Sequence, residues 1–167
     1  MNSKRFIHFT QMVDTTQKCV KRIEASFAPQ FGIKSVHLFW LHELSQHPEG
    51  LTATELAQRR MVDRSLISRE MDELKRHGLV EAKNDTGKNY NARLLLTEKG
   101  HAIAEQIGHV ALAVQNEASQ EISEEELLNF YATFEKIRDG LITIAQKLEE
   151  KKENGHVQLS QAQLSPG

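Results

Sequence analysis

Two arginines and two serines fall on one side of a segment near the middle of the chain, Arg64, Ser65, Ser68 and Arg69. Apolar residues recur on the opposite side at three- and four-residue steps, namely Ile67, Met71 and Leu74. This spacing predicts an amphipathic helix over residues 64–77 with its polar side exposed. An arginine guanidinium can bind guanine through two parallel hydrogen bonds or can bind a phosphate, and serine hydroxyls can donate to phosphates. The pattern therefore predicts a helix that binds DNA, although a solvated helix face would have the same pattern.

The preceding residues predict a second short helix and a tight turn. Thr52 and Glu55, three residues apart, form a capping box that would satisfy backbone N–H groups at the start of a helix over residues 52–60. Asp63 is a suitable N-cap for the helix over residues 64–77. Two helices joined by so short a turn indicate a helix-turn-helix.

A strand pair is predicted directly after this unit. Gly78 is placed to end the helix in the left-handed conformation, and residues 79–83 and 92–96 have the composition of short strands. Residues 84–91 between them are rich in turn formers and predict a polar hairpin tip. Two helices followed by a small sheet of two or three strands indicate a winged helix-turn-helix, which usually places one helix in the DNA major groove.

Long helices are predicted outside this unit, over residues 4–27, 35–46, 97–116 and 124–150. The first and the last carry apolar stripes that are too wide for one small winged-helix core to cover. Such stripes favour pairing with a second copy of the chain.

The predicted fold is mainly α, with four parts along the chain. They are an N-terminal dimerisation helix (1–34), a winged helix-turn-helix domain (35–100), C-terminal dimerisation helices (101–152) and a disordered tail (153–167).

Composition is that of a soluble globular protein. The 167 residues are 39% hydrophobic and 26% charged, and no apolar run approaches the ~18 residues of a membrane span. The N-terminus has no secretory signal pattern, and Cys19 is the single cysteine, so an internal disulfide is excluded. We therefore expect a cytoplasmic protein that does not act at a membrane.

The charge is divided unevenly along the chain. Residues 51–93 carry nine Lys or Arg against seven Asp or Glu, a net charge of +2. The remaining residues carry 12 basic and 16 acidic side chains, a net charge of −4. The positive charge thus lies in the segment that is predicted to bind DNA, which modestly supports that prediction.

Three stretches resemble the MarR family of bacterial transcription regulators: LTATELAQR (51–59), SLISREMDELKRHGLVE (65–81) and LLLTEKG (94–100). The resemblance extends over residues 4–150 with the same order of elements. It implies a homodimer that binds a pseudo-palindromic operator. It also implies repression that is relieved by a small ligand, often an aromatic acid, or by oxidation or a metal.

Three groups of residues are expected to contact DNA. Arg64, Ser65, Ser68 and Arg69 match the positions of the family that contact DNA. Thr52 and Thr54 lie where helix N-termini contact phosphates, although Thr52 is at least as well explained as a cap alone. In the wing, Lys88, Asn89 and Tyr90 stand where many members have Asp-Arg-Arg, so Lys88 or Arg93 would have to supply the positive charge. The alternative for the wing is a solvated hairpin without DNA contacts.

An effector site is expected, by analogy with the family, between the N-terminal helices and the DNA-binding domain. Its candidate lining residues are His37, Phe39 and Trp40, with Phe31 beside them. Phe39 and Trp40 are also ordinary core candidates.

Two sensing chemistries remain open. Cys19 has basic neighbours that can lower the pKa of a thiol, but an incidental surface cysteine is the simpler interpretation. His101, Glu105 and His109 fall at four-residue steps, and His37 and His42 share a second helix. These residues could bind a metal, yet a solvent-facing helix side has the same spacing, and no compact motif such as CxxC is present. We therefore predict no metal site and no cofactor.

The sequence also bears on two function classes other than a DNA-binding regulator. A winged-helix module that binds a protein partner would fit the low net charge and the missing wing arginine. An enzyme is not supported, because the sequence has no nucleophile–base set and no phosphate-binding glycine loop.

Overall fold

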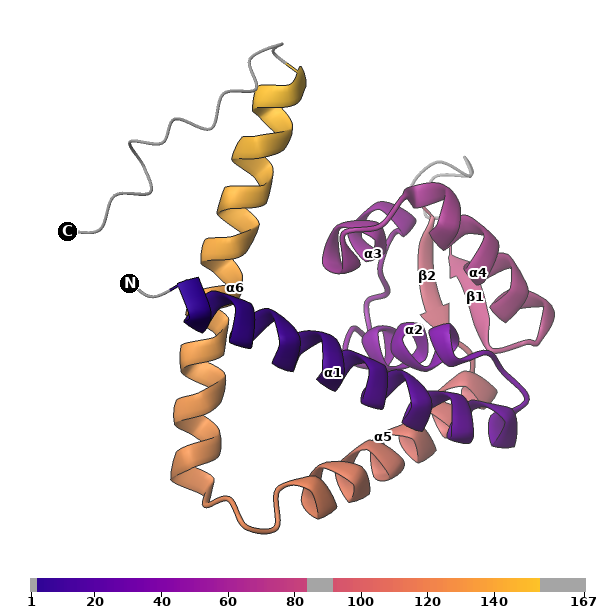
Figure 1. Ribbon diagram of the computed structural model, residues 1–167. Coiled ribbons are helices and arrows are strands. Elements are labelled where there is room, and N and C mark those ends of the chain that lie inside the picture. The colour runs from indigo at the N-terminus through magenta and orange to yellow at the C-terminus, as the bar shows by residue number, and fades with distance from the viewer. Residues whose placement is uncertain (1–2, 84–91, 154–167) are drawn as a thin grey trace. The chain divides into compact units, whose positions relative to one another are not determined.

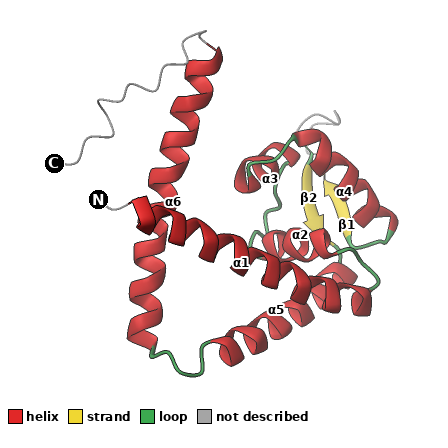
Figure 2. Cartoon of the chain, in the orientation of Figure 1, coloured by secondary structure: helices red, strands yellow, loops and turns green. Residues whose placement is uncertain are grey.

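The computed structural model describes residues 3–83 and 92–153, and this part of the chain is mainly helical (Figures 1 and 2). Its elements are α1 (Ser3–Phe27), the 3-10 helix η1 (Ala28–Phe31), α2 (Ser35–Ser45), α3 (Ala53–Arg60), α4 (Arg64–Arg76), β1 (Val80–Lys83), β2 (Arg93–Leu96), α5 (Glu98–Ala118) and α6 (Glu124–Glu153). The predicted mainly α fold is confirmed. The predicted hairpin tip and most of the predicted tail lie outside the described residues.

The chain divides into two compact units within α5. One unit contains α1 to α4, the strands and α5 as far as residue 114, and the other contains the end of α5 and α6. The winged helix-turn-helix lies wholly within the first unit.

The predicted capping box is present at the start of α3, and a second capping box stands at the start of α6. Thr52 Oγ1 accepts a hydrogen bond from the Glu55 amide at 3.2 Å, and the Glu55 carboxylate accepts one from the Thr52 amide at 2.7 Å. Ser123 and Glu126 exchange the same two bonds, at 3.3 and 2.9 Å. In each case local sequence is sufficient to start the helix, because both partners lie within one turn.

The start of α4 differs from the prediction at one point. Asp63 occupies the N-cap position with extended backbone, but its side chain makes no capping hydrogen bond to the described residues. Its carboxylate is exposed, and the Asp63 carbonyl accepts from the Leu66 amide at 3.0 Å. The tight turn before it is made by Met61, whose φ of 53° is left-handed.

The wing sheet consists of β1 and β2, which pair antiparallel with Val80 opposite Leu96. A single bridge adds Leu51 to β2, with the Leu51 amide 3.1 Å from the Leu94 carbonyl. The predicted sheet of two to three strands is therefore confirmed. Gly50 allows the chain before Leu51 to approach β2 this closely. Its φ is +77°, and a Cβ there would lie only 2.8 Å from the Leu94 carbonyl oxygen.

The core of the first unit lies between α2, the helix-turn-helix and the wing. Its fully buried side chains come from every one of these elements: Trp40, Leu41, Leu44, Leu56, Ile67, Met71, Leu74 and Leu79. The three residues predicted for the inner side of residues 64–77 are all among them. Their burial fixes which side of α4 faces outward.

Large apolar side chains are exposed along α1 and α6. On α1 they are Phe6, Ile7, Met12, Val13, Val20 and Ile23, and on α6 they are Leu128, Phe130, Tyr131, Phe134, Ile137, Leu141, Ile144 and Leu148. Monomeric proteins rarely expose apolar stripes of this extent. None of the described helices has the length and hydropathy that a membrane span requires.

Candidate DNA-binding surface

One side of α4 is polar and exposed. Arg64, Ser65, Ser68 and Arg69 are all exposed, whereas Ile67 on the opposite side is completely buried. The structure thus brings together the four residues that the sequence placed on one helix face. They cover the N-terminal half of α4. In helix-turn-helix proteins the N-terminal residues of the second, recognition helix contact base edges.

The side chains at the start of α3 differ in how far they are engaged. Thr52 Oγ1 donates to the Glu55 carboxylate at 2.9 Å and accepts from the Glu55 amide, so its hydroxyl is committed to the cap. Thr54 is exposed at the same helix N-terminus. Of the two threonines, Thr54 is the one whose hydroxyl can meet a phosphate without breaking the cap.

Arg93 is half-buried at the start of β2, opposite Lys83. Its Nη1 donates to the Gly50 carbonyl at 2.7 Å, across 43 positions of the sequence. This bond ties β2 to the turn before α3, a structural role that the sequence did not reveal. The other predicted wing contacts, Lys88, Asn89 and Tyr90, lie outside the described residues.

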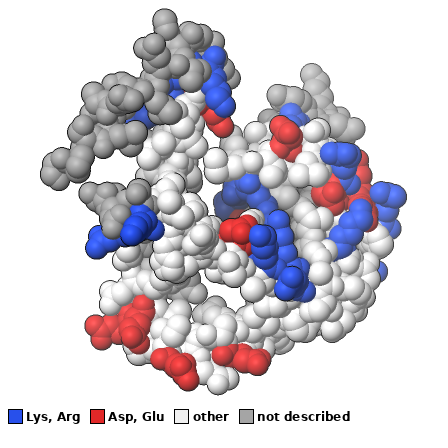
Figure 3. Space-filling model, in the orientation of Figure 1, with Lys and Arg blue, Asp and Glu red and all other residues white. Residues whose placement is uncertain are grey.

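Charges of both signs lie over the helix-turn-helix. Figure 3 shows Lys and Arg side chains beside Asp and Glu side chains in this region. Lys75 pairs with Asp72 at 3.4 Å, and Lys34 pairs with Glu73. Acidic neighbours lower the local positive potential, so binding to DNA would depend on specific contacts as well as on net charge.

Of the predicted effector-lining residues, His37 and Trp40 are fully buried and Phe39 is partly buried against the core. Trp40 is fully buried with its ring edge-on to Phe39, and their centroids are 4.9 Å apart. The Arg60 guanidinium lies 4.2 Å from the centroid of the Phe39 ring, a cation–π contact. Trp40 Nε1 has no hydrogen-bond partner among the described residues.

His37 is also fully buried, and its surroundings are polar. Its Nε2 donates to the Glu70 carboxylate at 2.9 Å, and its Nδ1 accepts from the Lys34 amide at 3.4 Å. Burial lowers the pKa of His37, against the opposing effect of the Glu70 hydrogen bond. His37 is therefore held neutral at the contact between α2 and α4.

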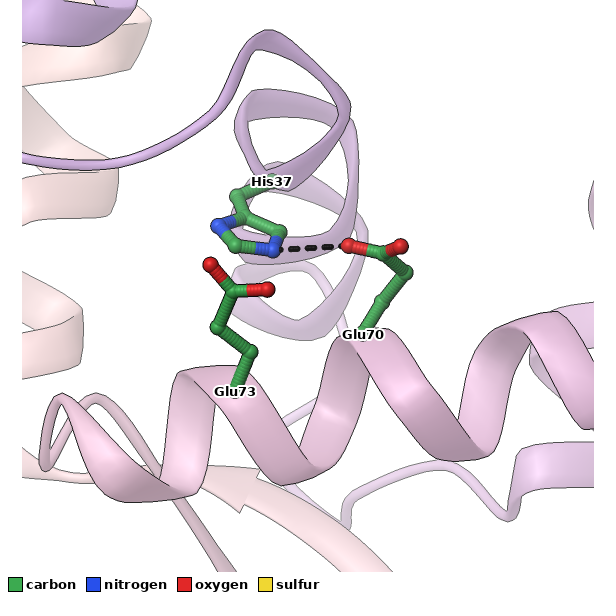
Figure 4. A group of neighbouring side chains, drawn as sticks. All are labelled: His37, Glu70 and Glu73. Carbon is green, nitrogen blue, oxygen red and sulfur yellow. Dashed lines mark hydrogen bonds and ion pairs between the residues drawn. The ribbon is translucent and has the colours of Figure 1, made fainter.

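Histidine and acidic residues meet at two places. His42, His101 and Glu105 line one shallow surface hollow, and His109 lies exposed one turn further along α5. Among the described residues, however, one group brings single donor atoms within 4.8 Å of one another, and it is His37, Glu70 and Glu73 (Figure 4). Sequence reasoning missed this group because 33 residues separate the histidine from Glu70.

Comparison with known proteins gives a family match and a shared fold. Residues 31–88, from η1 into the wing, match the model of the MarR family. No curated protein matches the sequence.

Several solved structures have the same fold at low sequence identity. A MarR family transcriptional regulator from Listeria monocytogenes, solved with a 26mer DNA, superposes with a TM-score of 0.77 at 16% identity, over 84% of this chain and 93% of that chain. The S. aureus MepR–DNA complex gives a TM-score of 0.71 at 20% identity, over 80% and 97% of the two chains. A MarR family regulator from Silicibacter pomeroyi gives 0.67 at 24% identity, over 75% and 84%.

Proposed function

We propose that the chain, whose residues 31–88 match the model of the MarR family and whose fold is that of solved members, is a homodimeric winged-helix transcriptional repressor of the cytoplasm. It binds a pseudo-palindromic operator in double-stranded DNA through α4 in the major groove and through the wing. A small ligand, most simply an aromatic acid, releases it from the DNA.

The exposed polar side of α4 is the observation that carries the proposal. Arg64, Ser65, Ser68 and Arg69 face solvent together, and the packing of Ile67, Met71 and Leu74 prevents the helix from turning them inward. A rigid helix with this face can enter the major groove, where arginine discriminates guanine by two hydrogen bonds. Two of the structures with this fold were solved as DNA complexes, which supports the same use here.

The exposed apolar residues of α1 and α6 support a homodimer. Two copies that cover these stripes would each present one α4, and the spacing of the two helices would set the spacing of the operator half-sites. A single winged helix-turn-helix makes few base contacts, so we expect specific binding to require both subunits of the dimer.

The residues around Arg60 support an anionic aromatic effector. The guanidinium over the ring of half-buried Phe39 offers both a cation for a carboxylate and a ring for stacking. Trp40 and His37 are buried behind it, so a ligand would have to open this part of the core to touch them. Such opening would disturb α2, which packs against the helix-turn-helix.

The test is a titration of fluorescent DNA from upstream of the protein's own gene, over a series of salt concentrations. A DNA-binding regulator should lose affinity linearly on logarithmic axes as salt rises, because phosphate contacts release counterions. Weak binding without sequence preference would favour the alternative, a winged-helix module that binds a protein partner.

Arg69→Ala tests the reading helix directly. We expect operator affinity to fall by about 1–3 kcal/mol while the melting temperature stays unchanged, because the side chain is exposed. Arg22→Ala, on an exposed part of α1, is the matched control and should leave affinity unchanged. Equal affinities for both variants would remove Arg69 from the DNA interface.

A further inference from the structure

The buried contact between α2 and α4 contains a set of metal-ligand donors. His37 comes from the first turn of α2, and Glu70 and Glu73 come from successive turns of α4, where all three side chains point toward one another (Figure 4). One donor atom from each lies within 4.8 Å of the other two. His37 is fully buried, and the side chains of Glu70 and Glu73 are only 15% and 21% exposed.

Two negative charges at this contact are offset by basic side chains at its edge. Neutral His37 and the two carboxylates carry a charge of −2, which the ammonium of Lys34, paired with Glu73, and the nearby guanidinium of Arg76 offset. The Lys34 side chain is 59% exposed and can move into solvent. A divalent cation in its place would make the group of three neutral, and a half-buried site of low dielectric favours that state.

We propose that His37, Glu70 and Glu73 bind one divalent transition-metal ion, of which zinc is the best match. A mixed set of one imidazole nitrogen and two carboxylate oxygens suits zinc, and three protein ligands leave a coordination position for water. The ion takes the place of the Nε2 proton, and the neutral imidazole carries its proton on Nδ1 instead. The long hydrogen bond from the Lys34 amide to Nδ1 and the Lys34–Glu73 pair are given up.

The site would join α2 to the helix that carries the DNA-binding face. A metal bond on each side of this contact holds α4 more firmly than the present hydrogen bond and ion pair do. The proposal goes beyond the proposed function and stands on the α2–α4 contact alone. Zinc binding is therefore measured without DNA, so its failure is distinct from a failure of operator binding.

The experiment uses the full chain after treatment with a chelator. Calorimetric titration with zinc chloride should detect a bound ion, and cobalt chloride should produce visible ligand-field bands. Glu70→Gln and Glu73→Gln should each weaken this binding by more than about tenfold, the smallest loss usual when residues that support a metal site are changed. Zinc should also raise the melting temperature of the wild type and not that of either variant.

The controls separate this site from the histidines of α5. In Glu70→Gln the amide oxygen still accepts the hydrogen bond of His37 Nε2, and in Glu73→Gln it still accepts from Lys34 Nζ, so both variants retain the packing while they lose the carboxylate charge. Glu105→Gln makes the same change beside His101 and His109 and should leave zinc binding unchanged. X-ray absorption of the zinc-loaded wild type should show one imidazole among oxygen ligands.

Three outcomes would overturn the proposal. They are a wild-type chain that binds neither ion, Gln variants at Glu70 and Glu73 that bind zinc as the wild type does, and an absorption spectrum with two or more imidazoles.

Discussion

The two arginines Arg69 and Arg93 were both predicted to contact DNA, yet their surroundings differ. Arg69 is exposed on α4, whereas Arg93 is half-buried and donates to the Gly50 carbonyl at 2.7 Å. The two guanidinium groups therefore differ in what they can do. That of Arg93 satisfies a buried carbonyl and so contributes to stability, whereas that of Arg69 is free of such a structural bond to Gly50. Arg93 as a DNA contact stays a prediction, while its part in holding β2 to the turn before α3 follows from the geometry.

Arg93→Ala should lower the stability of the protein. The Gly50 carbonyl loses its donor in a half-buried place, so we expect the free energy of unfolding to fall by about 1–3 kcal/mol. Urea denaturation measures this effect, and Arg69→Ala is the control that should leave the midpoint unchanged. Identical midpoints for the two variants would show that the Arg93 bond contributes nothing to folding.

Glu55 makes stability depend on pH. Hydrogen bonds from the Thr52 amide and then from the Thr52 hydroxyl lower the pKa of Glu55 below its usual value of 4.5. The carboxylate therefore contributes stability that is complete above that value and is lost as the pH falls through the lowered pKa. In Glu55→Gln this acid-dependent loss should be smaller, as urea denaturation at a series of pH values can measure. Parallel curves for wild type and variant would contradict the assignment.

At the scale of single elements, the helix-turn-helix and wing are joined by backbone contacts as well as by side chains. Leu51 bridges β2 immediately before α3 begins, and Gly50 allows the approach. The tight turn at Met61 sets α4 against α3, and the buried face of α4 sets its rotation. The position of the proposed DNA-binding face thus follows from three local constraints that act on neighbouring elements.

Two glycines should respond to alanine in opposite directions. Gly50→Ala places a side chain at φ +77° and 2.8 Å from the Leu94 carbonyl oxygen, so we expect a loss of about 1–3 kcal/mol. Gly108→Ala, within α5 where a Cβ meets nothing within 4 Å, should stabilise the protein by about 1 kcal/mol. Thermal melting of both variants measures the difference. A stable Gly50→Ala protein would show that the Leu51 bridge does not constrain the turn.

At the scale of the whole molecule, the exposed apolar residues exceed what the single chain covers. The stripe on α6 repeats at helical spacing from Leu128 to Leu148, and α1 carries a second stripe. Residues with this pattern favour a partner surface, and the proposed second copy would provide one of the same kind. Dimerisation and operator binding should therefore be linked, since one half-site supplies only part of the contacts.

Leu141→Glu should convert the protein to a monomer and weaken operator binding. A charge inside an apolar interface has no partner and must lose its hydration, which opposes association. Gln146→Glu makes a similar change at an exposed polar position of the same helix and should have no such effect. Sedimentation of both variants tests the state of association. A wild-type monomer at working concentration would contradict a mechanism in which both subunits of a dimer bind the operator.

Local sequence was sufficient to predict most of the secondary structure and one face of the site. Short segments of sequence determine the capping boxes at Thr52 and Ser123 and the left-handed conformation of Gly78, because the partners in each lie within a few residues. The exposed side of α4 was predicted for a similar reason, because helical periodicity separates Ile67 and Met71 from Arg64 and Arg69. Asp63 was the exception, since an exposed carboxylate can remain hydrated instead of capping the helix.

Tertiary structure alone decided the contacts between residues distant in sequence. Arg93 reaches Gly50 across 43 positions, and His37 reaches Glu70 across 33. No periodicity or motif spacing encodes such pairs, because they depend on how separate elements pack around a shared core. The chain's helices and the exposed polar face of α4 are thus local properties. The support for the wing and the buried donors between α2 and α4 exist only after those elements have packed together.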